Sequence, residues 1–344
     1  MDIQNHFYGH SAAYAAHAGL SRPRHIGGLV QHGWTPITPI ASHFADLASS
    51  APAGNLFVWS HEARGWNEAE SAKETGFTST AIGSPFLYLY DLVRRSGGIP
   101  PKTLPVVVIP FHGTRLVEVE GDQRAYAREV FEKEGPAVVC LHVDDMQRED
   151  IVSAWTEAGH RITTAGERRD PAFLARILWL VTSAEKVVSN RLATALMYAA
   201  AVGTPTEIYG PHFQIKGIAE TSSEEYLARI WPEFYSADTD QATLTALADA
   251  ELGRGAMRTP TGLRQVLGWQ SPSPRPAFDY WAGAPIEKAL TVLGIKKREV
   301  GEVVDGVKLN PLEFLKHPLE HLPDPLPRTV MRRVIKPEIA QPTR

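Results

Sequence analysis

The middle of the chain alternates short, almost wholly apolar runs with longer segments in which apolar residues recur every three or four positions. Leu104 to Thr114, LPVVVIPFHGT, is rich in β-branched residues and ends in Pro and Gly, which predicts a strand buried on both faces. The amphipathic stretch QRAYAREVFEKEG follows and ends at Gly135. The same order recurs through AVVCLHVDD, REDIVSAWTEAGH, RITTAG, DPAFLARILWLVTSA, EKVVSN, RLATALMYAAAVG and TPTEIYG. This alternation requires a parallel sheet covered by helices, so residues 100–275 are predicted to form a Rossmann-like domain.

The first hundred residues have a weaker pattern. HIGGLVQ, NLFVWS and TSTAIGS predict short strands, and HSAAYAAHAGL and ITPIASHFADLASS predict helices between them. Residues 1–99 are therefore predicted to form a second, smaller α/β domain, and RRSGGIPPKTLP is its linker to the larger one. Residues 276–344 are predicted to hold one helix and a Pro-rich tail. The predicted fold class is α/β, with two Rossmann-like domains that face a cleft and an irregular or helical C-terminal extension.

Helix starts and the tail give more local predictions. Asp170 is predicted to cap a helix that has Pro171 at its first position. Ser189 or Asn190 is predicted to cap the next helix, about a dozen residues long. In the segment Leu326–Pro337, four cations alternate with apolar residues. This pattern predicts either a basic amphipathic helix with weak, salt-sensitive membrane contact or a tail that packs back on the first domain.

Composition narrows the class of protein. The apolar fraction of 43% and the charged fraction of 22% are those of a soluble globular protein. A net charge of -4 excludes a global basic field, so no nucleic acid is expected as a partner. The single cysteine, Cys140, lies in an apolar run and is expected in the core. The chain shows no signal-peptide pattern and no apolar run near the ~20 residues of a membrane span, which predicts a cytoplasmic protein.

Polar and titratable residues gather where the predicted strands end. In open α/β sheets the ligand lies at the carboxyl ends of the strands, so these residues are the candidates for a site in the cleft. In the first domain they are His32, Gly33, His61, Glu62, Arg64, Gly83 and Ser84. In the second they are His112, Gly113, Thr114, His142, Asp144, Asp145, Glu167, Arg168, Ser189, Asn190, Arg191, Thr194, Glu207, Tyr209 and His212.

One stretch resembles a known family. In VVSNRLATALMYAAAVGTPTEIYG, a strand, a polar Ser-Asn elbow, a helix of small residues and a strand ending in Tyr-Gly follow one another. This order resembles the donor half of GT-B glycosyltransferases, most closely the surface-polysaccharide and teichoic-acid-type, CDP-polyol transferase-like group. The His-Gly pair of QHGW and the elbow AIGSP resemble the acceptor half of those enzymes. The resemblance covers roughly residues 25–212 and implies a nucleotide-sugar donor and a glycan or lipid-linked acceptor.

Roles for the site follow from this resemblance and from the chemistry of the residues. His32 is predicted to be the general base toward an acceptor hydroxyl, and Gly33 to allow close approach of the substrate. A turn histidine bonded to backbone is the alternative. His112 is predicted to neutralise the leaving phosphate. Ser189 to Arg191 are predicted to hold the diphosphate at a helix N-terminus, although Ser189 as a simple cap is the alternative.

Other candidates carry competing interpretations. His61, Glu62 and Arg64 form either an acceptor-side polar wall or an ordinary surface loop. Glu207 either bonds a ribose or base edge or is an exposed strand residue. Gly83, Ser84, Gly113, Thr114, Glu167, Asn190, Thr194 and Tyr209 complete the predicted binding residues, with His32, His112 and Glu62 as the catalytic set. Trp34, Trp59 and Trp66 lie near strand ends, where they either stack on sugar rings or pack in the core.

Three classes of function remain open. The first is a metal-independent glycosyltransferase, which needs no cofactor. The second is a CDP-polyol phosphotransferase or a sugar-nucleotide epimerase of the same architecture, the latter with Glu62 or Glu167 facing the sugar. The third is a non-catalytic two-domain binding module. No D-x-D ends a predicted strand, and no GxSxG, HExxH or GxGxxG occurs at a suitable place, so neither metal nor dinucleotide chemistry is expected. Membrane contact is expected to be peripheral at most, at the inner face.

Overall fold

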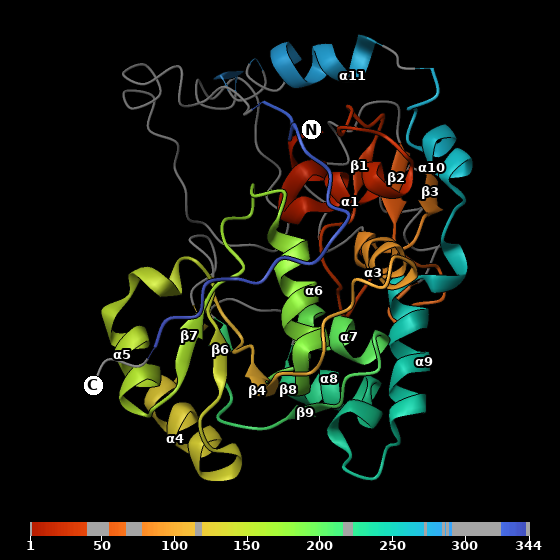
Figure 1. Ribbon diagram of the computed structural model, residues 1–344. Helices are drawn as coiled ribbons and strands as arrows, with labels where there is room; N and C mark the ends of the chain where they lie inside the picture. The colour runs from red at the N-terminus through yellow and green to blue at the C-terminus, as the bar shows by residue number, and fades with distance from the viewer. Residues whose placement is uncertain are drawn as a thin grey trace.

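The computed structural model describes residues 2–39, 55–66, 78–113, 119–215, 223–271, 274–283, 286, 289–290 and 325–341. Within these ranges lie two parallel sheets, the smaller above the larger in Figure 1, with helices around both. The predicted α/β fold class is confirmed. The helix predicted from ITPIASHFADLASS lies almost entirely outside the described residues. The predicted domain boundaries stay predictions, although residues 96–103 do connect a helix of the upper part to the first strand of the lower sheet.

The larger sheet has a reversal of strand order at its centre. Its five parallel strands lie in the order β7 (Arg161–Thr163), β6 (Val138–Cys140), β4 (Leu104–Val108), β8 (Ala184–Ser189) and β9 (Thr206–Ile208). From β4 the chain builds outward to β6 and β7, and then crosses to β8 and β9 on the other side. A crevice opens at the carboxyl ends of the two strands between which the order reverses, here β4 and β8. Topology therefore selects one place on this sheet for a ligand.

Both faces of the larger sheet are covered, which explains its apolar strands. Val106 and Val108 of β4 pack on one face against helices α4 (Gln123–Glu134) and α5 (Glu149–Glu157). Val107, between them, packs on the other face against α6 (Phe173–Ser183) and α7 (Thr194–Ala201). Successive side chains of a strand point to opposite faces, so a strand buried on both faces is apolar throughout. The four helices alternate with strands as predicted.

The smaller sheet holds β1 (Leu29–Val30), β2 (Asn55–Val58) and β3 (Thr78–Ala81), all parallel. One of its faces is covered by α1 (His10–His17), α3 (Pro85–Arg95) and α10 (Pro260–Val266), which share one buried apolar cluster with Phe57 and Trp269. Helix α10 follows the larger sheet in the sequence, so the chain returns to the smaller sheet after completing the larger one. The other described elements are η1 (Asp2–Gly9), β5 (Val119–Glu120), η5 (Asp145–Gln147), β10 (Gln214–Ile215), α8 (Glu224–Ile230), η7 (Pro232–Tyr235), α9 (Gln241–Leu252), η8 (Arg254–Ala256), α11 (Pro274–Phe278) and the π-helix Asp279–Gly283.

Two predicted helix caps are wrong. Helix α6 begins at Phe173 with Ala172 at the N-cap position, because the Asp170 carboxylate instead accepts the N–H of Ala172 and pairs with Arg176. Helix α7 begins at Thr194, and its N-cap residue, Ala193, provides no side-chain hydrogen bond. The polar elbow of β8 therefore precedes α7 without capping it, and the helix has 8 residues rather than about a dozen.

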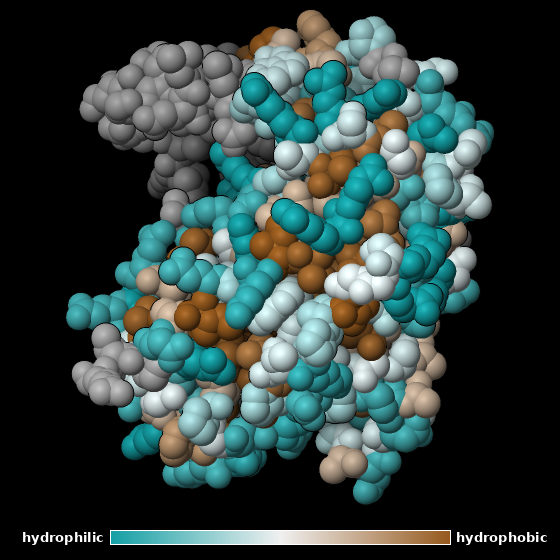
Figure 2. Space-filling model, viewed as in Figure 1, coloured by the Kyte–Doolittle hydropathy of each residue, from teal (hydrophilic) through white to brown (hydrophobic). Residues whose placement is uncertain are grey.

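The tail is extended, so the predicted basic helix is wrong, and the alternative, a tail that packs back on the N-terminal part, is confirmed. Residues 325–341 contain no helix and run across the front of both parts in Figure 1. The guanidinium of Arg332 donates to Leu20 O at 3.0 Å, and the N–H of Ile335 donates to Ala175 O at 3.2 Å. Figure 2 shows brown apolar patches between teal side chains on this face. Met331, Val334 and Ile335 pack on the main core, so tertiary packing rather than helical periodicity sets the tail's conformation.

One buried carboxylate joins the upper and lower parts. Glu251, at the end of α9, is only 3% exposed. Its Oε2 accepts the indole N–H of Trp34 at 2.7 Å, and its Oε1 accepts the backbone N–H of Arg64 at 2.8 Å and the indole N–H of Trp231 at 3.1 Å. Burial raises the pKa of the Glu251 carboxyl, while the three hydrogen bonds act in the opposite direction. Trp34 and Arg64 follow strands of the smaller sheet, so three donors from two parts of the fold meet on one acceptor.

We expect Glu251→Ala to lower the free energy of unfolding by roughly 3 kcal/mol, because it leaves two buried indole N–H groups and the partly buried N–H of Arg64 without an acceptor. Urea unfolding measures this change. Glu233→Ala is the matched control, since Glu233 pairs with the Arg64 guanidinium at 2.7 Å where both side chains remain about one-third exposed. That variant should lose less than about 1 kcal/mol. Equal losses in the two variants would show that Glu251 does not join the parts.

Candidate functional site

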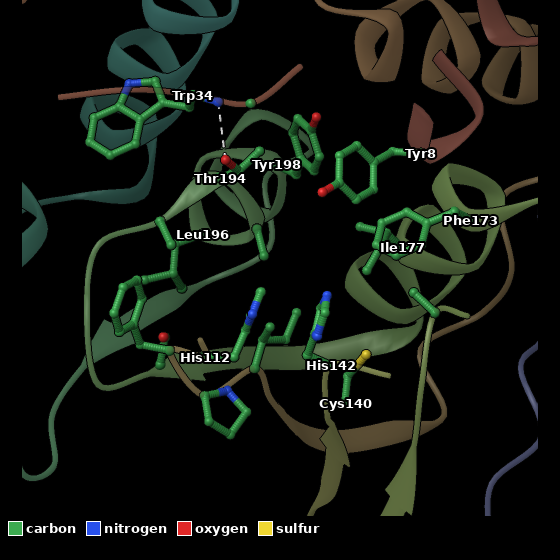
Figure 3. A pocket seen from close by; sticks show the side chains of 18 of the residues that line it. Tyr8, Trp34, His112, Cys140, His142, Phe173, Ile177, Thr194, Leu196 and Tyr198 are labelled. Atoms are coloured by element: carbon green, nitrogen blue, oxygen red, sulfur yellow. Dashed lines mark hydrogen bonds between the residues drawn. The ribbon is translucent and has the colours of Figure 1, made fainter. Parts of the chain in front are cut away.

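A cavity of about 430 Å³ lies at the reversal between β4 and β8, where the carboxyl ends of the larger sheet face the loop after β1. Its walls come from the segments that follow β1, β4, β6, β7 and β8, and from α6 and the start of α7. Figure 3 shows imidazole and aromatic side chains pointing into it from both sides. The cavity therefore occupies the place where the topology predicts a ligand.

The structure brings seven of the candidate site residues to the cavity wall: His32, Gly33, His112, His142, Ser189, Arg191 and Thr194. They come from strand ends of both sheets. The Thr194 hydroxyl accepts the backbone N–H of Trp34 at 3.0 Å, which fixes the start of α7 against the loop that carries His32. The sequence pattern thus located both sides of the cavity.

Other predicted residues lie away from the cavity wall and have structural contacts. Gly83 has a φ of 76°, and a Cβ there would lie 2.8 Å from Met257. Ser84 caps α3. The Arg64 guanidinium pairs with Glu233, and Glu207 pairs with Lys186 at 3.0 Å.

The remaining predicted residues also lie outside the described lining. The His61 ring stacks on Trp66 at 4.7 Å, and Asn190 accepts the N–H of Phe111. The Tyr209 hydroxyl donates to Glu134 at 3.2 Å. Glu62, Gly113 and Glu167 do not line the cavity either, whereas Thr114 lies outside the described residues. Their predicted roles stay predictions.

The N-terminal segment contributes residues that no sequence pattern indicated. Tyr8 and His10 line the cavity, and the Tyr8 ring packs on Phe173 with centroids 5.0 Å apart. Tyr8 has a φ of 56°, a left-handed conformation that is uncommon for a residue with a side chain. Gly9, with a φ of 75°, passes so close to Pro171 that a Cβ would lie 2.4 Å from its carbonyl oxygen. The Tyr-Gly pair was the available signal, since only glycine fits this close approach.

Three histidines of the cavity, the buried His10 and the partly buried His32 and His142, are held neutral. Burial lowers the pKa of His32 to about 4, and the nearby Arg168 lowers it further. Burial and then the neighbouring His32 lower the pKa of His10 to about 3. Nδ1 of His10 has no hydrogen-bond partner among the described residues. Burial also lowers the pKa of His142, to about 4, with His112 as the next contribution. Neutral imidazoles can accept protons or bond to a ligand in this enclosed space.

Two of the histidines form a stacked pair. The rings of His112, after β4, and His142, after β6, lie with centroids 4.3 Å apart and planes within 9°. Nδ1 of His112 donates to Gly113 O at 2.7 Å, and Nδ1 of His142 accepts the N–H of Asp144 at 3.3 Å. The sequence placed His142 at a strand end, but no role was predicted for it, because the stacking depends on two strands adjacent only in space.

The side of the cavity nearest β8 is cationic. Arg191 is 8% exposed, and its guanidinium lies 4.7 Å from the centre of the Phe111 ring. Burial lowers the pKa of Arg191, but the group remains charged, since Glu224 lies 4.0 Å away and favours the cation. The first turn of α7 has backbone N–H groups without intrahelical acceptors and faces the cavity at Thr194 and Ala195. No carboxylate occurs among the described lining residues, so this wall suits an anion.

The described residues also bear on metal binding and on membrane insertion. Within those ranges, no three His, Cys, Asp or Glu side chains gather as metal ligands would. Nor does any described helix combine the length and the apolar character that crossing a bilayer requires.

Comparison with known proteins gives likeness in structure alone. No family model matches the chain, and no curated protein matches it in sequence. Among solved structures it is similar to UDP-GlcNAc 2-epimerase from Neisseria meningitidis bound to UDP-GlcNAc, with 10% identity and a TM-score of 0.33 over 62% of this chain. The matched part spans 59% of that enzyme's chain. A TM-score this low carries no conclusion about the reaction or the ligand of this protein.

Acid should destabilise the protein through His10, His32 and His142. The pKa values of these histidines are lowered in the folded state. Their contribution to the free energy of unfolding is therefore complete above the ordinary histidine pKa of about 6.5, and it is lost as the pH falls from there toward about 4. At about pH 5 we expect a loss of about 2 kcal/mol for each histidine. Urea unfolding at neutral and acid pH measures this. His10→Gln should show a shallower pH dependence than His61→Gln, and identical slopes would contradict the assignment.

Proposed function

We propose that the protein is an enzyme that transfers a sugar from a nucleotide-activated donor to a hydroxyl acceptor, without a metal ion. The observation that carries the proposal is the composition of the cavity. It combines a neutral imidazole from the smaller-sheet part, His32, with a cation and a helix N-terminus from the larger-sheet part. Transfer between two bound substrates needs a base on one side and stabilisation of a departing phosphate on the other.

His32 is the proposed base. It lies after β1 at the cavity wall, and burial keeps its ring neutral well below physiological pH. A base with a pKa of about 4 is weak, so the proposal requires that the charge of the bound donor raise the pKa of His32 before it takes the proton of an acceptor hydroxyl. Gly33, beside it, presents backbone without a side chain, which leaves room for the acceptor.

The donor diphosphate is proposed to lie between Arg191, His112 and the first turn of α7. Arg191 supplies a full charge and α7 a partial positive charge, and both act in surroundings that exclude much of the water. His10, whose buried Nδ1 has no partner among the described residues, is a second sign that a polar ligand belongs in this cavity. The acceptor is proposed to be a glycan or a lipid-linked hydroxyl; a cytoplasmic location with peripheral membrane contact stays a prediction.

Polyol-phosphate transfer is the second candidate. It uses the same anion wall, and the stacked His112–His142 pair favours it because two imidazoles suit a phosphate that itself reacts. The epimerase alternative is less well supported, since Glu62 and Glu167 do not line the cavity. A binding module without catalysis would bind a nucleotide and release no product.

A thermal-shift panel of UDP, GDP, CMP, CDP and dTDP tests the donor site. We expect one nucleotide to raise the melting temperature clearly above the others. With that nucleotide, Arg191→Ala should weaken the diphosphate more than the parent nucleoside, because the lost charge acts on phosphate only. Arg191→Lys, which keeps a charge, should lose less. Equal weakening of the nucleoside and the diphosphate would indicate a folding defect and count against the anion site.

His32→Ala tests the base. If His32 takes the acceptor proton, kcat for sugar transfer from the sugar derivative of the nucleotide found in the panel should fall ~10²–10⁴-fold, while nucleotide affinity stays near that of the wild type. His61→Ala, which removes an imidazole outside the cavity, is the control and should keep kcat. Unchanged turnover in His32→Ala would remove that residue from the mechanism.

A further inference from the structure

The stacked pair formed by His112 and His142 has a property that goes beyond a positive wall. We propose that this pair is a proton-coupled oxyanion site: a divalent tetrahedral oxyanion, such as a phosphate ester, binds at the two Nε2 atoms and is accompanied by one proton from solvent, which adds to Nε2 of His112. The inference rests on the proposed function only for the identity of the anion, and it assigns His142 to binding as well.

The placement of the two rings supports a shared ligand. His112 follows β4 and His142 follows β6, adjacent parallel strands whose carboxyl ends lie at the cavity. The rings are stacked at 4.3 Å with an angle of 9° between their planes. Both point from the sheet into the cavity, side by side (Figure 3). One tetrahedral group can therefore meet both ring edges.

The hydrogen bonds of the two Nδ1 atoms set the tautomers. Nδ1 of His112 lies 2.7 Å from Gly113 O, and a carbonyl oxygen only accepts, so this nitrogen carries the proton. In the neutral ring, Nε2 of His112 is then an acceptor. Nδ1 of His142 accepts the backbone N–H of Asp144 at 3.3 Å, so the proton of that ring is on Nε2, which donates. The neutral pair thus presents one donor and one acceptor to the cavity.

A fully ionised oxyanion cannot satisfy this pair as it stands. Its oxygens only accept, so they bond to Nε2–H of His142 but oppose the lone pair on Nε2 of His112. Protonation of His112 at Nε2 turns that atom into a second donor and adds a positive charge beside the anion. The Nδ1–H bond to Gly113 is kept, so no other contact has to break. Binding and uptake of one proton therefore favour each other.

The charged groups around the pair are compatible with this exchange. The Asp144 carboxylate lies 3.7 Å from Nδ1 of His142, and Arg168 acts on that ring in the opposite direction by lowering its pKa. Asp145, whose pKa is raised by burial, interacts with His112 and is itself influenced by Arg148 and Asp150. Burial raises the pKa of the Cys140 thiol, which also lines the cavity, to about 12, so it stays neutral. None of these carboxylates is among the lining residues, so an anion in the cavity meets no like charge among the described residues of its wall.

Sulfate is the probe, because it does not change its own protonation near neutral pH. Any dependence of sulfate binding on pH therefore comes from protonation of the protein. Its dissociation constant is measured by NMR titration of the full-length protein between about pH 7 and about pH 8.5. Uptake of one proton predicts about tenfold weaker binding for each pH unit. Nitrogen-15 spectra of the imidazoles should show one ring, His112, changing from the neutral to the doubly protonated pattern as sulfate is added.

Variants identify the ring. His112→Gln provides an amide donor that cannot take up a proton, so its sulfate binding should lose the pH dependence. His142→Gln should bind more weakly but keep that dependence, and His61→Gln should match the wild type. Wild-type binding that does not change with pH, dependence that survives in His112→Gln, or no sulfate binding at all would each overturn the inference. A pH-independent result would instead fit a hydroxyl-bearing ligand on the neutral pair.

The outcome is separable from that of the nucleotide panel. A nucleotide that stabilises the protein, together with pH-independent sulfate binding, would leave the proposed function intact and remove this inference. Proton-linked sulfate binding with no response to any nucleotide would support this inference and count against the proposed function.

Discussion

The buried carboxylate of Glu251 is the interaction on which the arrangement of the two parts depends. It accepts three N–H groups from segments far apart in sequence, two of which follow strands of the smaller sheet. A buried carboxylate is costly unless its oxygens are bonded, and buried N–H groups are equally costly without an acceptor. The Glu251 carboxylate therefore requires its three N–H donors, and the donors require the carboxylate. The contact also positions Trp34, whose backbone N–H bonds to Thr194 at the start of α7.

The shape and the chemistry of the cavity depend on this arrangement of the two parts. The loop that carries His32 is held against the carboxyl ends of the larger sheet, so the imidazoles from both sides are removed from water together. Burial depresses their basicity, which makes them neutral and ready to respond to an incoming charge. No carboxylate lies among the described lining residues, so no like charge there opposes a bound anion. The cavity therefore brings the proposed anion binding and the proposed proton uptake together.

Much of the architecture could be predicted from the sequence, and the errors have identifiable causes. The strands of both sheets and helices α4 to α7 follow their apolar patterns closely, because each pattern reflects burial of whole faces. Helix starts were predicted less well. The Asp170 carboxylate bonds to Ala172 and Arg176, which ends the expected capping role, and α7 begins four residues beyond Asn190 at Thr194. The spacing of the tail allowed either a basic helix or a segment that packs back, and contacts with Ala175 and Leu20 hold it extended.

The sequence alone determined that parallel strands end in polar residues and that a ligand belongs at those ends, since hydrophobic periodicity and Gly or Pro elbows are local properties of the chain. Only the tertiary structure decided which ends converge. It brought His32, His112 and Arg191 to one cavity, and directed Arg64 and Glu207 into ion pairs outside the described lining. It also added Tyr8 and His10, whose positions depend on a strained N-terminal turn, and it stacked His142 on His112 from an adjacent strand. Contacts between segments distant in sequence have no local signature, because they arise only when burial has set the sheets against each other.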